Sequence, residues 1–400
     1  MFGVIAVAAL LAACGGGSPS ESDDAASSNA LNQVTVSVGA GVANVVNMPT
    51  VSVTICAPGT SNCQTVDKVL VDTGSFGLRI VSSAVSNVLS NLQTTTVNGG
   101  KALAECGQFV SSYTWGSVRT ADVKIGGETA SHVPIQTIGD LGTSDVPPSC
   151  SDGGSSANTA ASLGANGILG IGPAAYDCGS VCTTSTIYSN YYSCSNGNAS
   201  CESTTAALSE QVANPVRHFP IDNNGVIVTM NNSSGGSSVG TLTFGIGTRS
   251  NNTRSSGAAL LTTTAAGDVT GIFLGRAIGS AFFDTGSNAY FFDAGANTPS
   301  NVDLTVCSDN SAFYCPATDQ SLTATLVGAN GTQANVPFTV RNADTLFGSG
   351  RYAIDNLAGP FGNSLILDLG LPHFYGRTLY FGMDLRASSD STSGTPYVAF

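Results

Sequence analysis

The sequence is poor in charge, and basic residues are especially scarce. Its 400 residues include 13 Lys and Arg against 26 Asp and Glu, and charged residues make up only 10% of the chain. The formal net charge of −13 argues against a nucleic-acid partner, since binding by counterion release requires clustered Lys and Arg. Basic partners suit this charge better, although an acidic surface can equally serve solubility alone.

The chain also lacks the common signatures of metal, nucleotide and membrane-spanning proteins. His132, His218 and His373 are far apart in the sequence and have no metal-ligand spacing. There is no phosphate-binding loop, no repeat and no internal transmembrane run. Residues 236–240 formally match G-x-S-x-G, but they lie in a hairpin loop before a strand rather than between a strand and a helix. We therefore expect neither a metal nor a cofactor.

Long helical segments with apolar periodicity are scarce as well, whereas 48 glycines and many short alternating runs are present. Alternation predicts strands at residues 51–55, 65–71, 226–230 and 241–245. Short helices are expected only around residues 83–92 and 204–212. A mostly β chain of this length can bury one large two-lobed core or form two domains.

One tetrapeptide, Asp-Thr-Gly-Ser, occurs twice, at residues 72–75 and 284–287. Each copy directly follows an apolar run, Val-Leu-Val at 69–71 and Ala-Phe-Phe at 281–283. Each aspartate is therefore expected where a buried strand breaks into a glycine-containing turn. A single copy could be no more than an Asx-type turn, but two copies with matching flanks are hard to attribute to composition.

Two matched carboxylates, Asp72 and Asp284, predict an acid/base pair. Carboxyl groups in contact cannot both ionise, so one of them keeps a proton that a lone exposed aspartate would lose. One member can then take a proton from a water while the other protonates a scissile carbonyl oxygen. The residues expected to support the two carboxyls are Thr73, Gly74, Ser75, Thr285, Gly286 and Ser287.

At these motifs the chain resembles the pepsin-like aspartic proteases. Residues 166–172 look like the apolar-apolar-Gly strand that passes beneath the first catalytic loop in that family, and residues 365–372 are similar to its second-lobe counterpart, although Asp368 interrupts the apolar pattern. Residues 241–245 resemble a strand near the end of the first lobe. These segments extend the resemblance over nearly the whole chain from about residue 45.

Residues 113–117 lie about where that family carries its flap, a hairpin whose tyrosine closes over the substrate. The resemblance therefore makes Tyr113 the flap candidate, with Trp115 as the alternative. Together with the two aspartates, these residues complete the set of site residues that the sequence predicts.

The resemblance implies a mostly β, two-lobed pepsin-like acid protease fold with the active cleft between the lobes. We expect an N-terminal lobe at residues 33–248 and a C-terminal lobe at 249–400. The expected function is an aspartic-type endopeptidase that acts, as a monomer, on an extended polypeptide substrate. The alternatives are a catalytically inactive cell-surface protein that binds peptides or proteins in its cleft, and a cell-envelope enzyme acting on another amide.

The N-terminus predicts the compartment. Residues 2–13 are apolar but far too short to span a bilayer, and Leu-Ala-Ala-Cys at 11–14 resembles the bacterial lipoprotein cleavage box. We expect a signal peptide at 1–13, lipidation of Cys14 and a flexible polar tether at 14–32. The chain would then sit in the bacterial cell envelope, at the outer membrane or facing the periplasm, with the membrane as partner through its lipid anchor.

No Lys, Arg or His precedes Lys68, so the basic n-region of a signal peptide is missing. A start codon assigned too far downstream would explain this. The same absence argues against the zymogen type in which a basic pro-segment covers the two acids. The lipoprotein start, the abundant cysteines and the Gly-Leu-Pro-x-Phe-Tyr-Gly-Arg ending at 370–377 resemble, more narrowly, an uncharacterised bacterial family, DUF3443, placed among the pepsin-like folds.

Ten cysteines remain once Cys14 is set aside, which allows five disulfides in an oxidising compartment. Cys56 with Cys63 and Cys307 with Cys315 are expected to close local loops, and Cys106 to pair with Cys150 across the flap region. The last four, Cys178, Cys182, Cys194 and Cys201, cannot be matched from sequence. A zinc site built from this cluster is the alternative, which export makes less favourable.

The cleavage box generates the first testable prediction. Replacing the nucleophilic thiol, Cys14→Ser, should abolish lipid labelling and release the protein from the membrane fraction. Metabolic labelling with a radioactive fatty acid, followed by fractionation, measures both. A variant that is still labelled and membrane-bound would show that the anchor lies elsewhere.

Overall fold

The computed structural model describes residues 31–142, 146–152, 154–195, 200–233, 235–295, 297–386 and 394–400. The expected signal peptide, Cys14 and all of the tether before Leu31 lie outside these residues, so the lipid anchor stays a prediction. Within the described part of the chain, no helix is long and apolar enough to cross a membrane.

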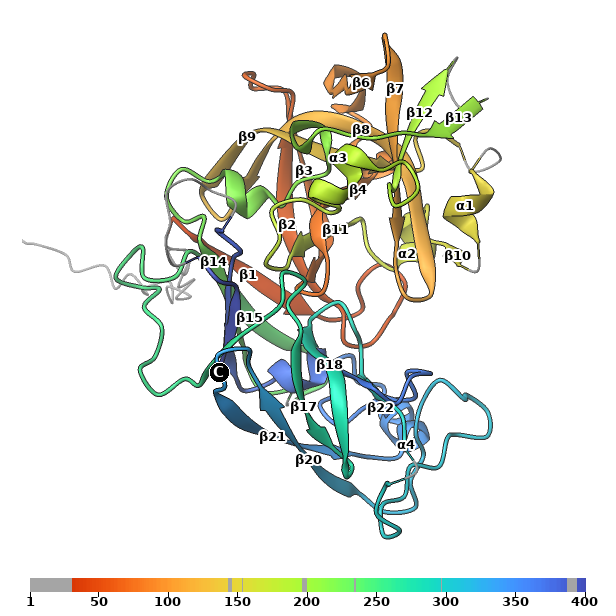
Figure 1. The fold of residues 1–400 in the computed structure, drawn as a ribbon, viewed down its shortest axis with the longest axis vertical. Helices are drawn as coiled ribbons and strands as arrows, with labels where there is room; N and C mark the ends of the chain where they lie inside the picture. The colour runs from red at the N-terminus through yellow and green to blue at the C-terminus, as the bar shows by residue number, and fades with distance from the viewer. Residues whose placement is uncertain are drawn as a thin grey trace, which may run out of the picture.

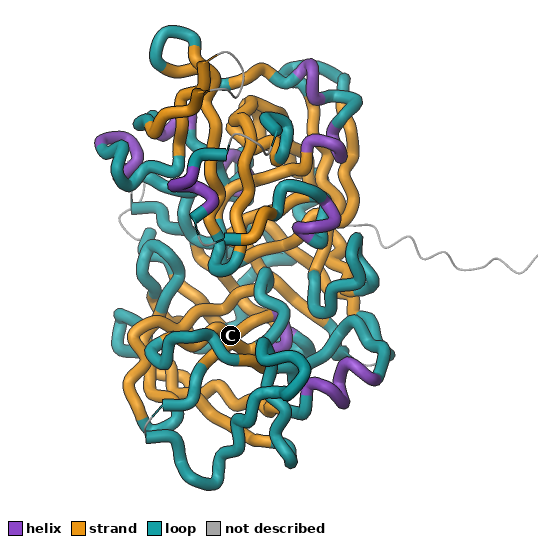
Figure 2. Tube along the Cα trace, turned by 90° about the vertical axis from the view of Figure 1, so that its right-hand side faces the viewer, coloured by secondary structure: helices purple, strands orange, loops and turns teal. Residues whose placement is uncertain are grey.

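Strands dominate the described residues, as Figure 2 shows, and the helices are short. The strands are β1 Gln33–Val38, β2 Pro49–Cys56, β3 Cys63–Asp72, β4 Phe76–Val81, β5 Gln93–Thr94, β6 Thr96–Val97, β7 Lys101–Gln108, β8 Ser112–Ile125, β9 Glu128–Ile138, β10 Ser155–Ser156, β11 Gly167–Ile171, β12 Tyr191–Ser195, β13 Ser200–Ser203, β14 Gly225–Met230, β15 Ser238–Phe244, β16 Leu260–Thr262, β17 Val269–Phe273, β18 Arg276–Asp284, β19 Tyr290–Phe292, β20 Gln320–Val327, β21 Gln333–Val340, β22 Ala358–Gly359, β23 Ile366–Gly370, β24 Thr378–Gly382 and β25 Tyr397–Ala399. The helices are α1 Pro148–Ser151, α2 Ala160–Leu163, α3 Ser180–Thr184 and α4 Ala343–Gly348, with 3-10 turns η1 Ser82–Val85, η2 Leu89–Asn91, η3 Leu208–Glu210, η4 Pro215–His218 and η5 Leu371–Phe374.

The strands form two hydrogen-bonded sheets, and in Figure 1 the larger extends from the upper lobe through β1, β14 and β15 in the middle of the molecule, while the smaller lies in the lower lobe. The larger sheet contains β1 to β16 together with β24 and β25, and the smaller runs β21-β20-β17-β18-β23-β19-β22. The predicted mostly β, two-lobed architecture is therefore confirmed. Because β24 pairs with β14, strands from the end of the chain complete the larger sheet. The lobe boundary near residue 248 stays a prediction.

The predicted strands form where the sequence alternates or carries buried apolar runs. In β2, Val51, Val53 and Ile55 are buried on one face, as the period of two requires. The two segments expected to be helical contain only 3-10 turns, η1 and η2 in the first and η3 in the second. Side chains that compete for backbone hydrogen bonds occur in both segments, Ser and Asn in the first and Thr and Ser in the second, and they disfavour longer helices.

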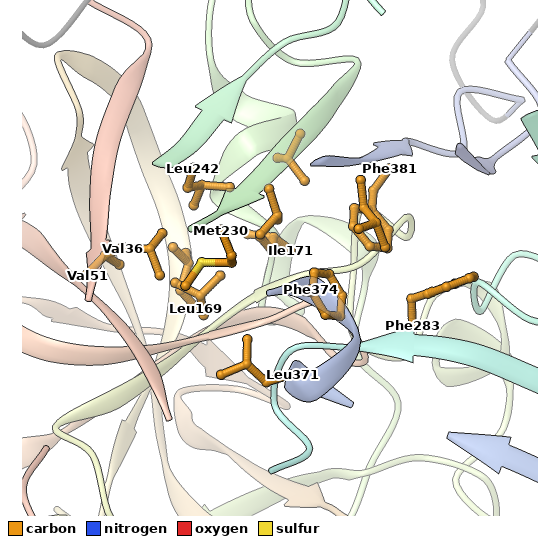
Figure 3. Packing of buried hydrophobic residues seen from close by; sticks show 14 of the residues in the cluster. Val36, Val51, Leu169, Ile171, Met230, Leu242, Phe283, Leu371, Phe374 and Phe381 are labelled. Atoms are coloured by element: carbon orange, nitrogen blue, oxygen red, sulfur yellow. The ribbon is translucent and has the colours of Figure 1, made fainter. Parts of the chain in front are cut away.

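One continuous apolar core runs beneath both lobes. It joins Leu169 and Ile171 of β11 to Phe283 of β18 and to Leu371 and Phe374 of η5. Figure 3 shows these side chains converging from the two lobes. Because the interior is shared, the lobes cannot move apart at this depth without exposing it to water.

All ten described cysteines form disulfides. The three pairs predicted from the sequence, Cys56–Cys63, Cys106–Cys150 and Cys307–Cys315, are confirmed. The four cysteines that the sequence left unmatched pair as Cys178–Cys182 and Cys194–Cys201. With their sulfurs in disulfides, these four offer no thiolates to zinc.

Asn47 fastens the segment before β2 to the smaller sheet. Its side-chain amide donates to the carbonyls of Asn288 at 2.7 Å and Ile354 at 2.8 Å. Its carbonyl oxygen accepts from the backbone N–H of Ile354 and from the hydroxyl of Tyr375, both at 2.8 Å. Asn47 is 1% exposed, so these four bonds satisfy the whole side chain in a dry environment.

Asn47→Ala should lower the free energy of unfolding by at least about 3 kcal/mol, because buried partners lose their hydrogen bonds. Asn47→Asp should be no better, since a carboxylate would face two carbonyl oxygens. Asn44 is a matched control: it also has a positive φ of 58°, against 55° at Asn47, but it is exposed. Asn44→Ala therefore carries the backbone penalty and loses only one exposed hydrogen bond, accepted from the Tyr352 hydroxyl at 3.3 Å. Equal losses in chemical denaturation would contradict the assigned role of the buried bonds.

Candidate active site

The two sheets deliver Asp72 and Asp284 in the same way. Asp72 ends β3 and lies in register with Gly170 of the parallel strand β11, and Asp284 ends β18 in register with Gly370 of the parallel strand β23. The apolar runs before each aspartate pack in the core, and the Thr-Gly-Ser turn carries the chain away from it. The tetrapeptide therefore occupies equivalent places in the two lobes.

Four buried hydrogen bonds between Thr73 and Thr285 and the facing lobe lock the two turns together. The Thr73 hydroxyl donates to the carbonyl of Phe283 at 2.8 Å and accepts from the backbone N–H of Thr285 at 3.0 Å. The Thr285 hydroxyl makes the equivalent bonds from the other side: it donates to the carbonyl of Val71 at 2.7 Å and accepts from the N–H of Thr73 at 3.1 Å. Each threonine thus uses both its donor and an acceptor site across the lobe boundary.

Each carboxyl is also held by its own turn. The N–H of Gly74 donates to Asp72 Oδ1 at 2.8 Å, and the Ser75 hydroxyl donates to Oδ2 at 2.5 Å. Asp284 is held in the same way. The N–H of Gly286 donates to its Oδ1 at 2.7 Å, and the Ser287 hydroxyl donates to its Oδ2 at 2.9 Å. Two donors per carboxylate fix its plane and stabilise its charge.

The glycines bring the two carboxyls into contact. A Cβ atom at Gly74 would lie 2.6 Å from Cγ of Asp284, and one at Gly286 would lie 2.8 Å from Cγ of Asp72. Each carboxyl therefore packs against the opposite turn at a distance that only glycine permits. The same Cβ at Gly286 would lie 2.8 Å from Asp72 Oδ1 and 3.1 Å from Asp284 Oδ1, so the two carboxyls converge on one point. The structure thus brings together all eight residues of the two motifs, in the mirrored arrangement expected of a pepsin-like fold.

The electrostatics of the pair favour a shared proton. Burial, and then the charge of Asp72, hold the pKa of Asp284 well above its usual range. A hydrogen bond between two carboxyls requires one proton between them, so the pair carries about one negative charge. The arrangement can therefore supply an acid and a base at the same point.

A hollow of about 180 Å³ lies beside the first turn. Thr73 and Gly74 form one wall, Phe282 and Phe283 another, and the ring of Phe76 contributes to the lining. The lining is mainly apolar and includes neither Asp72 nor Asp284, so the hollow suits an apolar side chain near the first turn.

The hairpin of β7 and β8 is where the sequence places the flap, but its tip is formed by residues 109–111 and not by Tyr113 or Trp115. Tyr113 is 8% exposed and Trp115 is fully buried, because both pack with Tyr192. Figure 1 shows the tip of this hairpin pointing down from the upper lobe toward the lower one. A flap, if this hairpin forms one, would therefore carry Phe109 rather than Tyr113 over the cleft.

A buried charge network that the sequence did not reveal supports this hairpin. Arg79 is 4% exposed, donates to Glu105 of β7 at 2.5 Å and lies 3.5 Å from Asp177. Tyr191 donates to the same Asp177 at 2.5 Å. Burial would lower the pKa of Arg79, but Glu105 and Asp177 raise it. Its guanidinium also lies 5.8 Å from the ring centre of Phe109, a cation–π contact at the hairpin tip.

No function was predicted for Asp368 either. In the sequence it stood out only as an interruption of an apolar strand. Asp368 is 2% exposed in β23, two residues before the glycine that faces Asp284. Burial, and then the charge of Asp284, hold the pKa of Asp368 well above its usual range. A charged residue in an apolar strand was the one available signal.

The described residues offer no separate metal centre. One group of potential ligands, Cys307, Cys315 and Asp344, is close enough to hold an ion, but its two sulfurs form a disulfide. His373 is 2% exposed and makes no hydrogen bond through its ring within the described chain, and burial lowers its pKa to about 3. It packs among Phe283, Tyr290 and other rings as a neutral side chain.

Comparison with known proteins gives the family. The model of the family described as "Protein of unknown function (DUF3443)" matches residues 28–400. No curated protein sequence matches the chain. Among solved structures, the aspartic proteinase from Irpex lacteus is similar, with 14% identity and a TM-score of 0.47 over 92% of this chain and 96% of that one.

The threonine lock generates a prediction of its own. Thr73→Val keeps the shape of the side chain but leaves the carbonyl of Phe283 and the N–H of Thr285 without partners, which should cost about 2 kcal/mol of unfolding free energy. Thr73→Ser keeps the hydroxyl and should retain most of that stability. Denaturation of the two variants side by side measures the difference, and equal stability would show that the lock contributes little.

Proposed function

The chain belongs to the DUF3443 family, and we propose that it is an aspartic endopeptidase. The observation that carries the proposal is the contact between Asp72 and Asp284, each held by two donors of its own turn. Two carboxyls with one shared proton perform general acid and general base catalysis without a metal or a nucleophilic side chain.

In the proposed reaction, a water molecule lies between the two carboxyls and the peptide carbonyl. The ionised carboxyl takes a proton from this water as its oxygen attacks the carbonyl carbon, and the protonated carboxyl donates to the carbonyl oxygen. The tetrahedral intermediate then collapses: the newly protonated carboxyl gives its proton to the amide nitrogen, the C–N bond breaks, and the other carboxyl takes a proton from a hydroxyl of the intermediate, which returns the dyad to its singly protonated state. No charge is left on the enzyme beyond the one with which it began.

The substrate proposed here is an extended polypeptide. The hollow beside Gly74 is lined by aromatic residues, including Phe76 and Phe282, and would accept an apolar side chain of the bound peptide. The hairpin tip around Phe109 would cover the peptide from the upper lobe. The scarcity of positive charge favours neutral or basic peptides over acidic ones.

The proposed location is the bacterial cell envelope, with the protein anchored through Cys14. Asn32, just before β1, is buried and donates to the carbonyl of Phe244 at 2.8 Å, so the proposed tether would end at this point. The residues between Cys14 and this point are rich in Gly and Ser, which suits a flexible connection. Five disulfides fit an oxidising compartment.

Cleavage of a mixed peptide library by the full-length protein tests the function. Asp72→Asn and Asp284→Asn should each reduce cleavage at least about 10³-fold, and the double variant should be scarcely worse, because the pair acts as one unit. Folding should survive, since Asn is nearly isosteric with Asp. Asp122 is a matched control: its carboxyl also accepts from two backbone N–H groups, those of Gly59 and His132, outside the two turns. Asp122→Asn should therefore cleave like the wild type.

Activity should also depend on pH with a definite sign. Because burial and the neighbouring charge raise the pKa of Asp284, the dyad keeps its shared proton well above the ordinary Asp range, and cleavage should decline as pH rises and that proton leaves. Initial rates of the wild-type protein from acidic to alkaline pH measure this decline. Cleavage that rises toward alkaline pH, or that survives both Asn substitutions, would assign the activity to other residues.

A further inference from the structure

The two halves of the site differ at one buried position. In the upper lobe, Ile168 of β11 lies between Leu70 and Arg79 of the neighbouring strands. In the lower lobe, the corresponding residue of β23 is Asp368, in register with Phe282 and Phe291. An apolar side chain in one half is thus replaced by a carboxyl in the other, on the same sheet face as Asp284.

Asp368 lies in a largely apolar environment, with the polar groups of the dyad and Ser287 on one side. The side chain is 2% exposed, and within the described residues Oδ1 has no hydrogen-bond partner. Ser287 adjoins the end of β23, since its carbonyl accepts from the N–H of Leu371 at 2.8 Å, and its hydroxyl acts on the pKa of Asp368 as a hydrogen-bonding group. The same hydroxyl donates to Asp284 Oδ2 at 2.9 Å, so Ser287 stands between the two acids. In the upper lobe, Ser75 bonds to Asp72 but has an isoleucine in place of the second acid.

The number of protons decides the direction of these bonds. A serine hydroxyl has one proton to donate and two lone pairs that accept. If Ser287 gives its proton to Asp284, a hydrogen bond to Asp368 exists only when Asp368 is itself protonated and donates to Ser287 Oγ. An ionised Asp368 would instead compete with Asp284 for the one proton and would add a buried, weakly partnered charge.

We propose that Asp368 is a positioning residue of the dyad: as a neutral acid it donates to Ser287, so that the Ser287 hydroxyl donates to Asp284 and not to Asp368. The chain Asp368 to Ser287 to Asp284 stabilises negative charge on Asp284 alone. The two carboxyls receive the same kinds of hydrogen bonds from their own turns, and this chain of bonds makes them different. The proposal rests on the dyad chemistry proposed above.

The charged groups around Asp368 agree with a neutral form. Asp284 acts on it from β18 and Asp72 from across the dyad, and both would repel a third negative charge. The strand on its other side, β19, presents only the ring of Phe291 in register. Burial and these two acids together raise the pKa of Asp368 well above its usual range.

Nuclear magnetic resonance of the full-length protein, labelled with carbon-13 at the aspartate carboxyls, tests the protonation directly and does not require turnover. The wild type should show a carboxyl that stays protonated through neutral pH, and Asp368→Asn should remove that resonance. A resonance of Asp368 that titrates in the ordinary Asp range would overturn the proposal.

The same titrations test the chain of hydrogen bonds. Asp368→Ile copies the upper lobe and removes the donor, so the lower of the two dyad titrations should move up by roughly half to one pH unit. Asp368→Asn, whose amide still donates to Ser287, should leave that titration in place. Ser287→Ala should give the same upward shift as Asp368→Ile, and the two changes together should add little. Ile168→Val, at the matching position of the other lobe, controls for altered packing and should shift nothing.

The direction of the shift separates the alternatives. If Asp368 were ionised, both of its substitutions would remove a negative charge and lower the dyad titrations, and that result would overturn the proposal. If the protein cleaves peptides, the pH at which the cleavage rate falls on the acidic side should shift in the same direction as the lower dyad titration. Absence of cleavage in every variant and in the wild type would contradict the proposed function, while the resonances would still decide the role of Asp368.

Discussion

Contact between the carboxyls of Asp72 and Asp284 is the constraint on which the rest of this structure depends. Like charges at this distance repel, so Asp72 and Asp284 stay together only because the scaffold opposes their separation and a proton joins them. The four hydrogen bonds of Thr73 and Thr285 supply that opposition, with each turn anchored on the strand of the facing lobe. The shared core beneath the lobes makes the lock rigid, because neither turn can withdraw without exposing apolar side chains.

Duplication gives the site its shape, and departures from duplication give each half its own surroundings. The position seven residues after each aspartate is Arg79 in the upper lobe and Phe291 in the lower. Arg79 requires the buried acids Glu105 and Asp177, and the three together fasten the hairpin whose tip carries Phe109. A buried cluster of this kind adds little net stability, but removing one member would leave the others unpaired, so it specifies one position of the hairpin.

The sequence predicted the elements whose signals are local. The repeated tetrapeptide, the apolar strands before it and the short disulfide loops such as Cys56–Cys63 can all be identified within a dozen residues. Contacts between distant segments could not be predicted in this way. Tyr113 lies near the expected flap, yet its ring is buried, because only the pairing of β7 with β8 decides which residues form the tip. The meaning of Asp368 depends on Ser287, 81 positions away, which no local pattern connects to it.

An acid and a base must differ, although the scaffold that holds them here is nearly symmetric. Each aspartate receives one backbone N–H and one serine hydroxyl, so these bonds alone give neither carboxyl a preference for the proton. Groups outside the two turns must therefore make the two carboxyls differ in their affinity for the proton. In this chain the asymmetric groups are the apolar Ile168 behind one turn and the carboxyl of Asp368 behind the other. A neutral donor in that second place lowers the cost of negative charge on Asp284, and the substrate then meets a dyad whose proton already has a preferred side.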